Sequence, residues 1–464
     1  MARVLLIDPP FSAFMGFSRW FFPMGPAVLA DFLIGRGHDV LVYDADHIDS
    51  DVSYTYREML TVFENYRQSV DDLSHPAYKQ IAETAASFRP HLVGITCMSV
   101  KTPAVLAVAQ TIKSVTDAPV ACGGPHATAM PEHLLQSPYI DYVIRESGLA
   151  AIDLLVDHIT DPASVNLTDI PNLSCRSSDD EYTHNPAAHR NWDAMSWSPA
   201  RSCLRAPAPY SASDLSMVMA SIGCPFKCRF CSKTFGNQIV HRQIGCLARE
   251  VEDLTKSYGV SFLHFKDDTM GTDRARFEAI CDLIAGCDAV AGWECLTRID
   301  VADDRMLARL RRSKCSRIKV GVESGSPRIL DKLDKRITPA DVVDFSKRAE
   351  EHGLHWSAFY MIGLPDETPQ DIRMTLDLIE QSRPDHVSIS IFTPYPGSHF
   401  YDRLKRENRM TEPVDWAALD PFSLAPQFER AIPHDEFVAL ALETAAFVDH
   451  YNQASTWADR AQSG

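Results

Sequence analysis

Apolar, β-branched runs alternate with amphipathic segments of helix length over the first 150 residues. This alternation is typical of an open, parallel α/β sheet with helices between successive strands. Ligands of such sheets bind at the carboxyl ends of the strands. The sequence predicts five strands that end in polar or glycine-containing loops, at 4–10, 38–46, 91–99, 118–126 and 141–148.

The alternation stops between Thr160 and Asp214, where proline, serine and aspartate are frequent. This composition predicts a linker with a short hairpin. A second series of strands and helices follows, and six such units predict a partial barrel with its active site at the carboxyl ends of the strands. Its strands are predicted at 215–223, 261–268, 291–298, 316–324, 354–365 and 386–397.

The pattern therefore predicts an α/β fold in four parts. An open, parallel, Rossmann-like domain occupies 1–159 and a linker 160–214. A partial (β/α)6 barrel then occupies 215–400, and 401–464 form a small C-terminal cap with a helical stretch at 435–452.

Composition limits the kinds of molecule that the protein is expected to bind. The net charge is −17 and no basic patch stands out, which argues against a nucleic-acid partner and favours a small-molecule substrate. The chain begins with a short apolar run that soon meets an aspartate and two prolines, and no run approaches the roughly 18 apolar residues of a membrane span. We therefore expect a cytoplasmic protein whose twelve cysteines are thiols or metal ligands and not disulfides.

Three cysteines lie on one short segment directly after a predicted strand. Cys224, Cys228 and Cys231 give the spacing C-x3-C-x2-C. Three thiolates on a tight loop suit three irons of a [4Fe–4S] cluster and leave the fourth iron open. A zinc site would need a fourth ligand, and Cys203 and Cys246 are too isolated to suggest one. Three core thiols, or a redox pair with one extra cysteine, are the remaining alternatives.

The cysteine segment resembles the hallmark of the radical S-adenosylmethionine (SAM) superfamily, in which an aromatic residue, here Phe230, precedes the last cysteine. The resemblance extends over about 215–400. It implies a [4Fe–4S] cluster and SAM as cofactors, and a reducing system for the cluster. In that family the electron from the cluster cleaves SAM, and the resulting 5′-deoxyadenosyl radical abstracts hydrogen from the substrate.

The same resemblance implies roles for residues around SAM. Phe230 is expected near the adenine, and Asp267 or Asp268 of the KDDT segment is expected to hold the amino group. Arg298 is placed to meet the SAM carboxylate, for which an arginine is a natural bidentate partner. Pairing of Arg298 near Asp300 is the alternative.

Two later segments complete the expected SAM site. In GVESGS, Glu323 and Ser324 resemble the family's polar contacts to the methionyl or ribose portion. In MIGLPDET, Gly363 resembles the glycine that lets the backbone approach the adenine. A simple strand-to-helix turn is the alternative for this last segment.

The first domain resembles the cobalamin-binding domain that precedes the barrel in one radical SAM subclass, through segments 8–10, 23–46, 99–102 and 123–128. The subclass lacks a lower-ligand histidine, so His126 is expected to pack in its loop and not to bind cobalt.

One segment departs from this subclass. Where cobalamin-binding members carry Gly-Glu-Gly-Glu, this chain has Arg145, Glu146, Ser147 and Gly148. A long cationic side chain fills space that glycine would leave open. Cobalamin binding is therefore uncertain, and the sequence favours a domain kept for structural support.

The reaction depends on that point. With cobalamin, the resemblance implies methyl transfer to an unactivated carbon. Without it, the chain resembles the radical SAM diol dehydratases of aminoglycoside biosynthesis, of the kind that carry out 3′-deoxygenation on the way to apramycin, and this dehydration of an aminosugar 1,2-diol is the favoured interpretation. An NAD(P)H-dependent reductase would then act on the product. A scaffold or sensor that holds an iron–sulfur cluster without turnover is the alternative from another class.

Diol dehydration needs a base and a proton donor within hydrogen-bond reach of two oxygens. Strand alternation predicts that His264, Lys266 and Asp268 share one face, and Tyr360 lies near the end of the fifth barrel strand. These four are the candidate catalytic residues, although a core role is an alternative for His264 and Tyr360.

Overall fold

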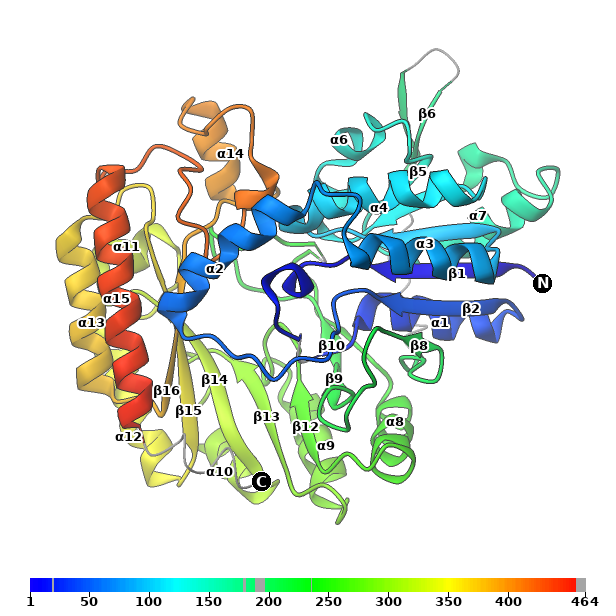
Figure 1. Ribbon diagram of the computed structural model, residues 1–464. Helices are drawn as coiled ribbons and strands as arrows, with labels where there is room; N and C mark the ends of the chain where they lie inside the picture. The colour runs from blue at the N-terminus through cyan, green and yellow to red at the C-terminus, as the bar shows by residue number, and fades with distance from the viewer. Residues whose placement is uncertain (19–20, 178–180, 188–196, 235, 456–464) are drawn as a thin grey trace. The chain divides into compact units, whose positions relative to one another are not determined.

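The computed structural model describes five stretches of the chain, 1–18, 21–177, 181–187, 197–234 and 236–455. The chain divides into two compact units, coloured along the sequence in Figure 1. Unit 1 contains Met1–Ser53 and Glu64–Leu215, and unit 2 contains Tyr54–Phe63 and Ser216–Gly464.

Unit 1 is built on a sheet with the strand order β7-β6-β5-β4-β3-β1-β2-β8, in which all neighbours are parallel except those of β6 and β7. The five strands predicted here are confirmed with shorter bounds. The strands are β1 (Arg3–Asp8), β2 (Asp39–Asp44), β3 (Leu92–Thr96), β4 (Val120–Gly123), β5 (Tyr142–Ile144), β6 (Leu173–Arg176), β7 (Tyr182–His184) and β8 (Leu204–Arg205).

Helices connect the parallel strands of unit 1. Proline at the first turn favours helix initiation in α3 and α4, because its missing N–H is not needed there. These helices are α1 (Met24–Gly35), α3 (Pro76–Phe88), α4 (Thr102–Val115), α5 (Pro125–Ala129), α6 (Pro131–Leu135) and α7 (Leu149–Thr160), with short 3-10 turns at Ser12–Met15, Ser99–Lys101 and Leu167–Asp169. The helix α2 (Tyr56–Ser69) is divided between the units, because its residues up to Phe63 belong to unit 2.

The segment expected to be a linker contributes three strands to this sheet. The predicted hairpin is present as β6 and β7, and β6 pairs antiparallel with β5. At the other edge, β8 pairs with β2. These additions cover strand edges that would otherwise expose unpaired N–H and C=O groups, so the interpretation of 160–214 as a linker is wrong.

Unit 2 contains the predicted partial barrel, a parallel sheet with the order β16-β15-β14-β13-β12-β9. All six predicted strands are confirmed. They are β9 (Met217–Val218), β12 (Phe262–Phe265), β13 (Gly292–Thr297), β14 (Cys315–Glu323), β15 (His355–Ile362) and β16 (His386–Ile391).

Local chemistry fixes where the helices of unit 2 begin. Capping boxes start α12 at Thr338 with Asp341 and α13 at Thr368 with Asp371, because each pair satisfies backbone N–H groups reciprocally. The helices are α8 (Ile244–Ser257), α9 (Arg274–Ala285), α10 (Asp304–Arg312), α11 (Pro327–Lys332), α12 (Pro339–Glu351), α13 (Pro369–Ser382), α14 (His399–Arg406) and α15 (His434–Ala454), with a 3-10 turn at Trp416–Ala418.

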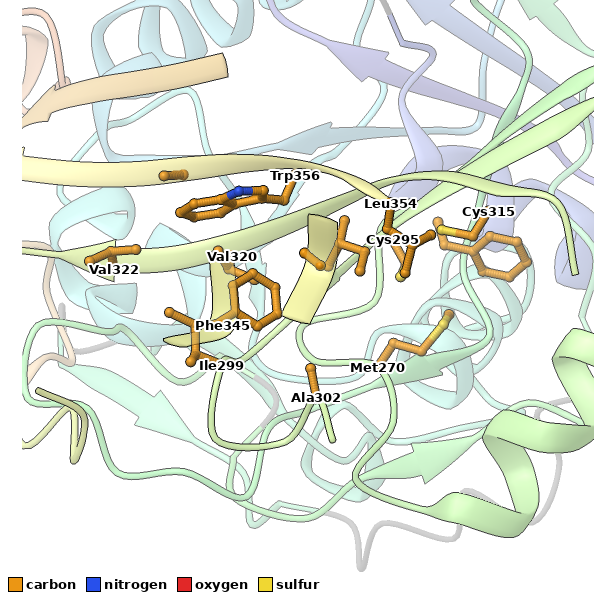
Figure 2. Close-up of a cluster of buried hydrophobic side chains, with 14 of the residues drawn as sticks. Met270, Cys295, Ile299, Ala302, Cys315, Val320, Val322, Phe345, Leu354 and Trp356 are labelled. Atoms are coloured by element: carbon orange, nitrogen blue, oxygen red, sulfur yellow. The ribbon is translucent and has the colours of Figure 1, made fainter. Parts of the chain in front are cut away.

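The core of unit 2 lies between the strands and their helices. Ile318, Val320 and Val322 alternate along β14 and are fully buried in this layer. On β15, Trp356 packs edge-on against Phe345 of α12, as Figure 2 shows. Arg317 and Lys319, which alternate with the buried residues on β14, therefore face the barrel interior, because successive side chains point to opposite faces.

The expected C-terminal cap includes a helix that covers the barrel wall. In Figure 1, α15 runs beside β16, and Asn452 both accepts from the Val387 N–H and donates to its carbonyl. Within the described part of the chain, no helix has the length and apolar character needed to span a membrane.

Candidate active site

The three cysteines lie on a hairpin loop that enters the mouth of the barrel. The loop connects β10 (Ser221–Ile222) and β11 (Val240–His241), which pair antiparallel. Gly223 begins it with φ +86°, and a Cβ there would lie 2.1 Å from the carbonyl oxygen of Gln238. Asp268, after β12, accepts a hydrogen bond from the Gly223 N–H at 2.8 Å. Both features hold the loop against the strand ends.

The thiols are close to one another and to polar donors. Cys224 Sγ lies 3.3 Å from Thr269 Oγ1, and Arg298 Nη1 donates to Cys228 Sγ at 3.3 Å. Desolvation, and then the charges of the other two cysteines, raise the pKa of Cys231 to about 11, although the residue as a whole is exposed. The three sulfurs therefore interact electrostatically.

This donor set fits a polynuclear cluster better than a single ion. All three cysteines are free thiols. Among the described residues, no three His, Cys, Asp or Glu side chains converge in a way that would hold one metal ion. In a [4Fe–4S] cluster each thiolate binds its own iron, so the sulfurs need not converge on a point. The cysteine loop therefore suits a [4Fe–4S] cluster.

A buried ion pair lies beside Phe230, which packs against the hydrophobic cluster that contains Ile329, Leu333 and Leu364. Lys335 Nζ is 5.8 Å from the centre of the Phe230 ring and donates to Glu323 Oε1 at 2.8 Å. Gly321 makes this pair possible, because a Cβ there would lie 2.2 Å from the Glu323 carboxylate. Lys335 was missed by the sequence reasoning, since it follows a short helix and carries no motif.

Arg298 is engaged by the protein around the cysteine loop. It forms a bidentate ion pair with Asp300 at 2.8 and 2.9 Å, and it donates to the carbonyl of Lys335. Its guanidinium also covers the ring of Phe226 at 4.0 Å. In this structure Arg298 positions the cysteine loop and pairs with Asp300, which was the alternative, and its contact with the SAM carboxylate stays a prediction.

Two predicted SAM contacts are buried in the framework. Asp267 is 3% exposed, and its carboxylate accepts from the Ala220 N–H and the Ser221 hydroxyl. Ser324 is fully buried, and its hydroxyl accepts from the Ser326 N–H. Both side chains bond to the loops at the strand ends in this structure, and their contacts with SAM stay predictions. Of the aspartate pair, Asp268 is the exposed member.

Gly363 is needed for a reason other than the one predicted. Its φ is +82°, and a Cβ would lie 2.6 Å from the ring of Phe437 on α15 and 3.3 Å from Arg430 Nε. The Gly363 and Leu364 N–H groups both donate to the buried carboxylate of Glu367. The glycine therefore serves the close contact with α15 on the outer side of the sheet.

A charged cluster occupies the barrel interior, where two predicted catalytic residues lie. The Glu294 carboxylate lies 2.7 Å from His264 Nδ1 and accepts from Arg317 Nε at 2.8 Å and from Lys319 Nζ. Burial raises the pKa of Glu294, but the His264 bond and both cations outweigh it and lower the pKa overall. Burial, followed by the charge of Lys319, lowers the pKa of Lys266 to about 8.

The interior cluster extends across the sheet to β16. Burial, and then the charges of Arg317 and Lys319, lower the pKa of His386 to about 4. The sequence reasoning missed Glu294, Arg317, Lys319 and His386. The signal was present on β14, where SRIKVGVE alternates polar and apolar residues over one strand.

The prediction that Tyr360 is catalytic is wrong. Tyr360 is 1% exposed and shares its strand face with Trp356, so it packs in the layer between strands and helices. Burial raises the pKa of its hydroxyl above 10. His264 and Lys266 share the interior face as predicted, whereas Asp268 lies beyond the strand end and bonds to the cysteine loop.

In unit 1, the strand ends carry polar side chains that pair internally. His126 is buried, with Nδ1 3.1 Å from Ser99 Oγ and Nε2 3.1 Å from His133 Nδ1, which agrees with a packing role. Arg145 donates to the Asn185 carbonyl beside β7. The expected filling of an open loop by Arg145 is therefore corrected, because its guanidinium is bound at the hairpin edge.

The ends of β1 and β2 are closed by a buried ion cluster. Lys101 Nζ donates to Asp8 at 2.8 Å and to Asp46 at 3.1 Å, and all three are buried. Burial, and then the charges of Asp8 and Asp46, raise the pKa of Asp44 to about 7, and Tyr210 donates to Asp44 at 2.8 Å. These side chains occupy the edge of the sheet where ligands of such folds bind.

Comparison with known proteins agrees with both units. Residues 218–379 match the radical SAM superfamily and residues 21–156 match the B12 binding domain. An uncharacterized methyltransferase of Pyrococcus horikoshii is 29% identical over 333 residues, 70% of this chain and 72% of the relative. The anaerobic magnesium-protoporphyrin IX monomethyl ester cyclase of Cereibacter sphaeroides is 24% identical over 71% of this chain, which spans 55% of the cyclase.

Solved structures share the fold over nearly the whole chain. The radical SAM methyltransferase TsrM from Kitasatospora setae, with tryptophan and a SAM analogue bound, superposes with a TM-score of 0.72 at 17% identity, covering 96% of this chain and 89% of TsrM. The cobalamin-dependent radical SAM enzyme OxsB superposes with a TM-score of 0.72 at 12% identity, covering 96% and 66%. A radical SAM domain implies a [4Fe–4S] cluster and SAM as cofactors. The chain therefore combines an N-terminal B12-binding domain with a C-terminal radical SAM domain.

Proposed function

We propose that the protein is a cobalamin-dependent radical SAM enzyme that transfers a methyl group to a small molecule. The observation that carries the proposal is the presence of both domains in one chain. The names of two similar proteins, the Pyrococcus methyltransferase and TsrM, support methyl transfer over dehydration. The favoured sequence interpretation, an aminosugar diol dehydratase, therefore becomes the second candidate.

Different residues of unit 2 would hold the cluster and keep its loop in position. Cys224, Cys228 and Cys231 would hold the cluster, which together with SAM supplies the radical that activates the substrate. Arg298 and Asp268 keep the loop in position through Cys228 Sγ and the Gly223 N–H.

The side of the cysteine loop near Phe230 is the proposed place of SAM. Lys335 and Glu323 flank Phe230 there, and an ammonium with a carboxylate suits the zwitterionic methionyl portion of SAM.

Unit 1 offers surface that suits a corrin ring. Met98, in the loop after β3, is 43% exposed, and a flexible thioether adapts well to a large apolar ligand. Gly123 ends β4 and Gly124 follows it, so neither position carries a side chain, and Gly124 adopts φ +108° with its Cβ position 2.9 Å from the Cys97 carbonyl oxygen. These residues would hold cobalamin, which supplies the methyl group.

Radical dehydration without cobalamin remains the second candidate because of one observation. The buried cluster around Lys101 closes the ends of β1 and β2, where a bound ligand would compete with it. In this candidate Lys266, whose pKa is lowered to about 8, is suited to proton transfer near neutral pH, with His264 beside it on the same strand. An NAD(P)H-dependent reductase would act on the product of this reaction only.

The test is anaerobic reconstitution of the full chain with iron, sulfide and excess cobalamin, followed by desalting and measurement of iron and cobalt per chain. Retained cobalt near one per chain, with methyl transfer from SAM, supports the first candidate. A complete cluster without cobalt, and with SAM cleavage to 5′-deoxyadenosine, supports the second. A cluster without any SAM cleavage would contradict both and support the non-catalytic scaffold.

A further inference from the structure

The barrel interior carries an excess of positive charge. Lys266, Arg317 and Lys319 come from β14 and the end of β12, and Glu294 is the acidic side chain with which Arg317 and Lys319 pair. Glu294 is ionised near neutral pH because its pKa is lowered, and its carboxylate pairs with both Arg317 and Lys319, while the charge of Lys319 also acts on Lys266.

The pKa of one histidine, His386, responds to this positive charge. His386, on the opposite edge of the sheet, has its pKa lowered to about 4, partly by the charges of Arg317 and Lys319. His386 is therefore neutral near pH 7. Lys266 follows β12, Arg317 and Lys319 lie on β14, and His386 lies on β16 of the same sheet.

The cationic groups are accessible from the barrel interior. The side chains of Arg317 and Lys319 are 17% and 20% exposed, whereas Glu294 is 2% exposed. Water therefore reaches the cations but not the carboxylate that pairs with them. The buried carboxylate of Glu294 holds the partly exposed cations of Arg317 and Lys319 in position, and cations held in this way form a preorganised anion-binding site.

We propose that the substrate carries an anionic group, a carboxylate or a phosphate, that binds Arg317, Lys319 and Lys266 inside the barrel. This deepens the proposed function and rests on it, since it names the substrate class for the same radical SAM site. Guanidinium and ammonium groups recognise both anions through charge-assisted hydrogen bonds. A polycationic aminosugar would be repelled by the same cluster.

The test measures anion binding by titration calorimetry on the reconstituted protein with saturating SAM at low salt. Inorganic phosphate and acetate are the two probes, and they distinguish the two anion classes. The variant Lys319→Met removes one charge-assisted bond and is expected to weaken binding at least about tenfold. Lys256→Met is the matched control, because Lys256 lies on α8 with a side chain that is 73% exposed and pairs with Glu252 on the helix surface.

Binding of phosphate or acetate by the wild type and Lys256→Met, weakened in Lys319→Met, supports the proposal and names the anion. Absence of binding by the wild type, or equal binding by both variants, overturns it. Thermal unfolding checks that the variants fold. If Lys319→Met does not fold, Lys266→Met provides a second test. Iron content and 5′-deoxyadenosine formation, measured on the same samples, report the proposed function separately, so failure of one claim is distinguishable from failure of the other.

Discussion

The carboxyl group of Glu367, which bonds to the segment after β15, makes the stability of the protein depend on pH. Glu367 is fully buried, and one of its oxygens accepts from the Gly363 and Leu364 N–H groups at 2.5 and 3.2 Å. Among the described residues its Oε1 has no hydrogen-bond partner. Burial raises the pKa of Glu367 from 4.5 to about 8. The folded chain therefore holds this proton more tightly than the unfolded chain does.

The first prediction concerns the sign of this effect. Between about pH 5 and 8 Glu367 keeps a proton in the folded chain that it loses in the unfolded chain, so its contribution to the free energy of unfolding falls as pH rises, by up to about 1.4 kcal/mol per pH unit. Glu367→Gln cannot titrate, so its slope is expected to differ from that of the wild type by this contribution. Urea denaturation of both proteins across the window measures it. Parallel curves would show that Glu367 is ionised throughout.

The second prediction concerns Lys101 in unit 1. Lys101→Met would leave Asp8 and Asp46 buried without that ammonium, which is expected to lower the free energy of unfolding by about 3–5 kcal/mol. Lys113→Met is the control, because its pair with Asp141 is partly exposed and should be worth about 1 kcal/mol or less. Chemical denaturation of each variant measures its loss in the free energy of unfolding. Equal losses would contradict the structural role given to the Lys101 cluster.

At the scale of elements, the contact between β15 and α15 depends on one glycine. Gly363→Ala would meet the Phe437 ring at 2.6 Å and would also strain a backbone at φ +82°. Gly259→Ala is a control for the backbone alone, since Gly259 has φ +67° and open space around its Cβ position.

The third prediction follows from this difference. Gly259→Ala is expected to cost about 1–2 kcal/mol of stability from the left-handed backbone. Gly363→Ala should cost about 1–3 kcal/mol more, because overpacking forces Phe437 or the strand to move. Adding Phe437→Ala should not increase the loss in full, since it removes the clash. Urea midpoints measure all three, and equal effects of the two glycine variants would rule out the clash.

Strand alternation predicts which face of a sheet a side chain takes, and it was correct for some of the candidate catalytic residues and not for others. It placed His264 and Lys266 correctly on one face. It failed for Tyr360, since the prediction considered only the position of Tyr360 near the strand end. Trp356 and Tyr360 are four residues apart and share a face, so the helix-facing tryptophan already identified the outward side.

At the scale of the whole molecule, cofactor binding is separable from folding. Cys228 is half-buried and Cys231 exposed, and neither belongs to the hydrophobic core of unit 2. The fourth prediction is that Cys231→Ala loses most of the reconstituted iron and its visible absorbance, while the cluster-free protein keeps its stability within about 0.5 kcal/mol. Cys281→Ala changes a residue of the hydrophobic core and should keep the reconstituted iron but lower the stability of the protein.

An outcome in which Cys231→Ala retains a full complement of iron would remove the assignment of the cluster ligands. The comparison with Cys281→Ala uses the same chain and the same chemistry. It therefore distinguishes loss of a ligand from loss of a buried thiol.

The sequence alone determined the features that depend on local pattern and spacing. Strand periodicity located all eleven predicted strands, because the buried faces of parallel sheets need runs of apolar residues. The spacing of Cys224, Cys228 and Cys231 indicated an iron–sulfur cluster, since the thiolates of such a loop are neighbours in sequence and in space.

Only the tertiary structure decided how distant polar residues are paired. Glu294, Arg317 and Lys319 lie on two strands, and the sequence does not state which side chains meet across a curved sheet. The same reason explains why β8 joins β2 although more than 150 residues separate them, and why Gly363 serves Phe437. Local pattern fixes which face a side chain takes, whereas its partner depends on strand order and helix packing.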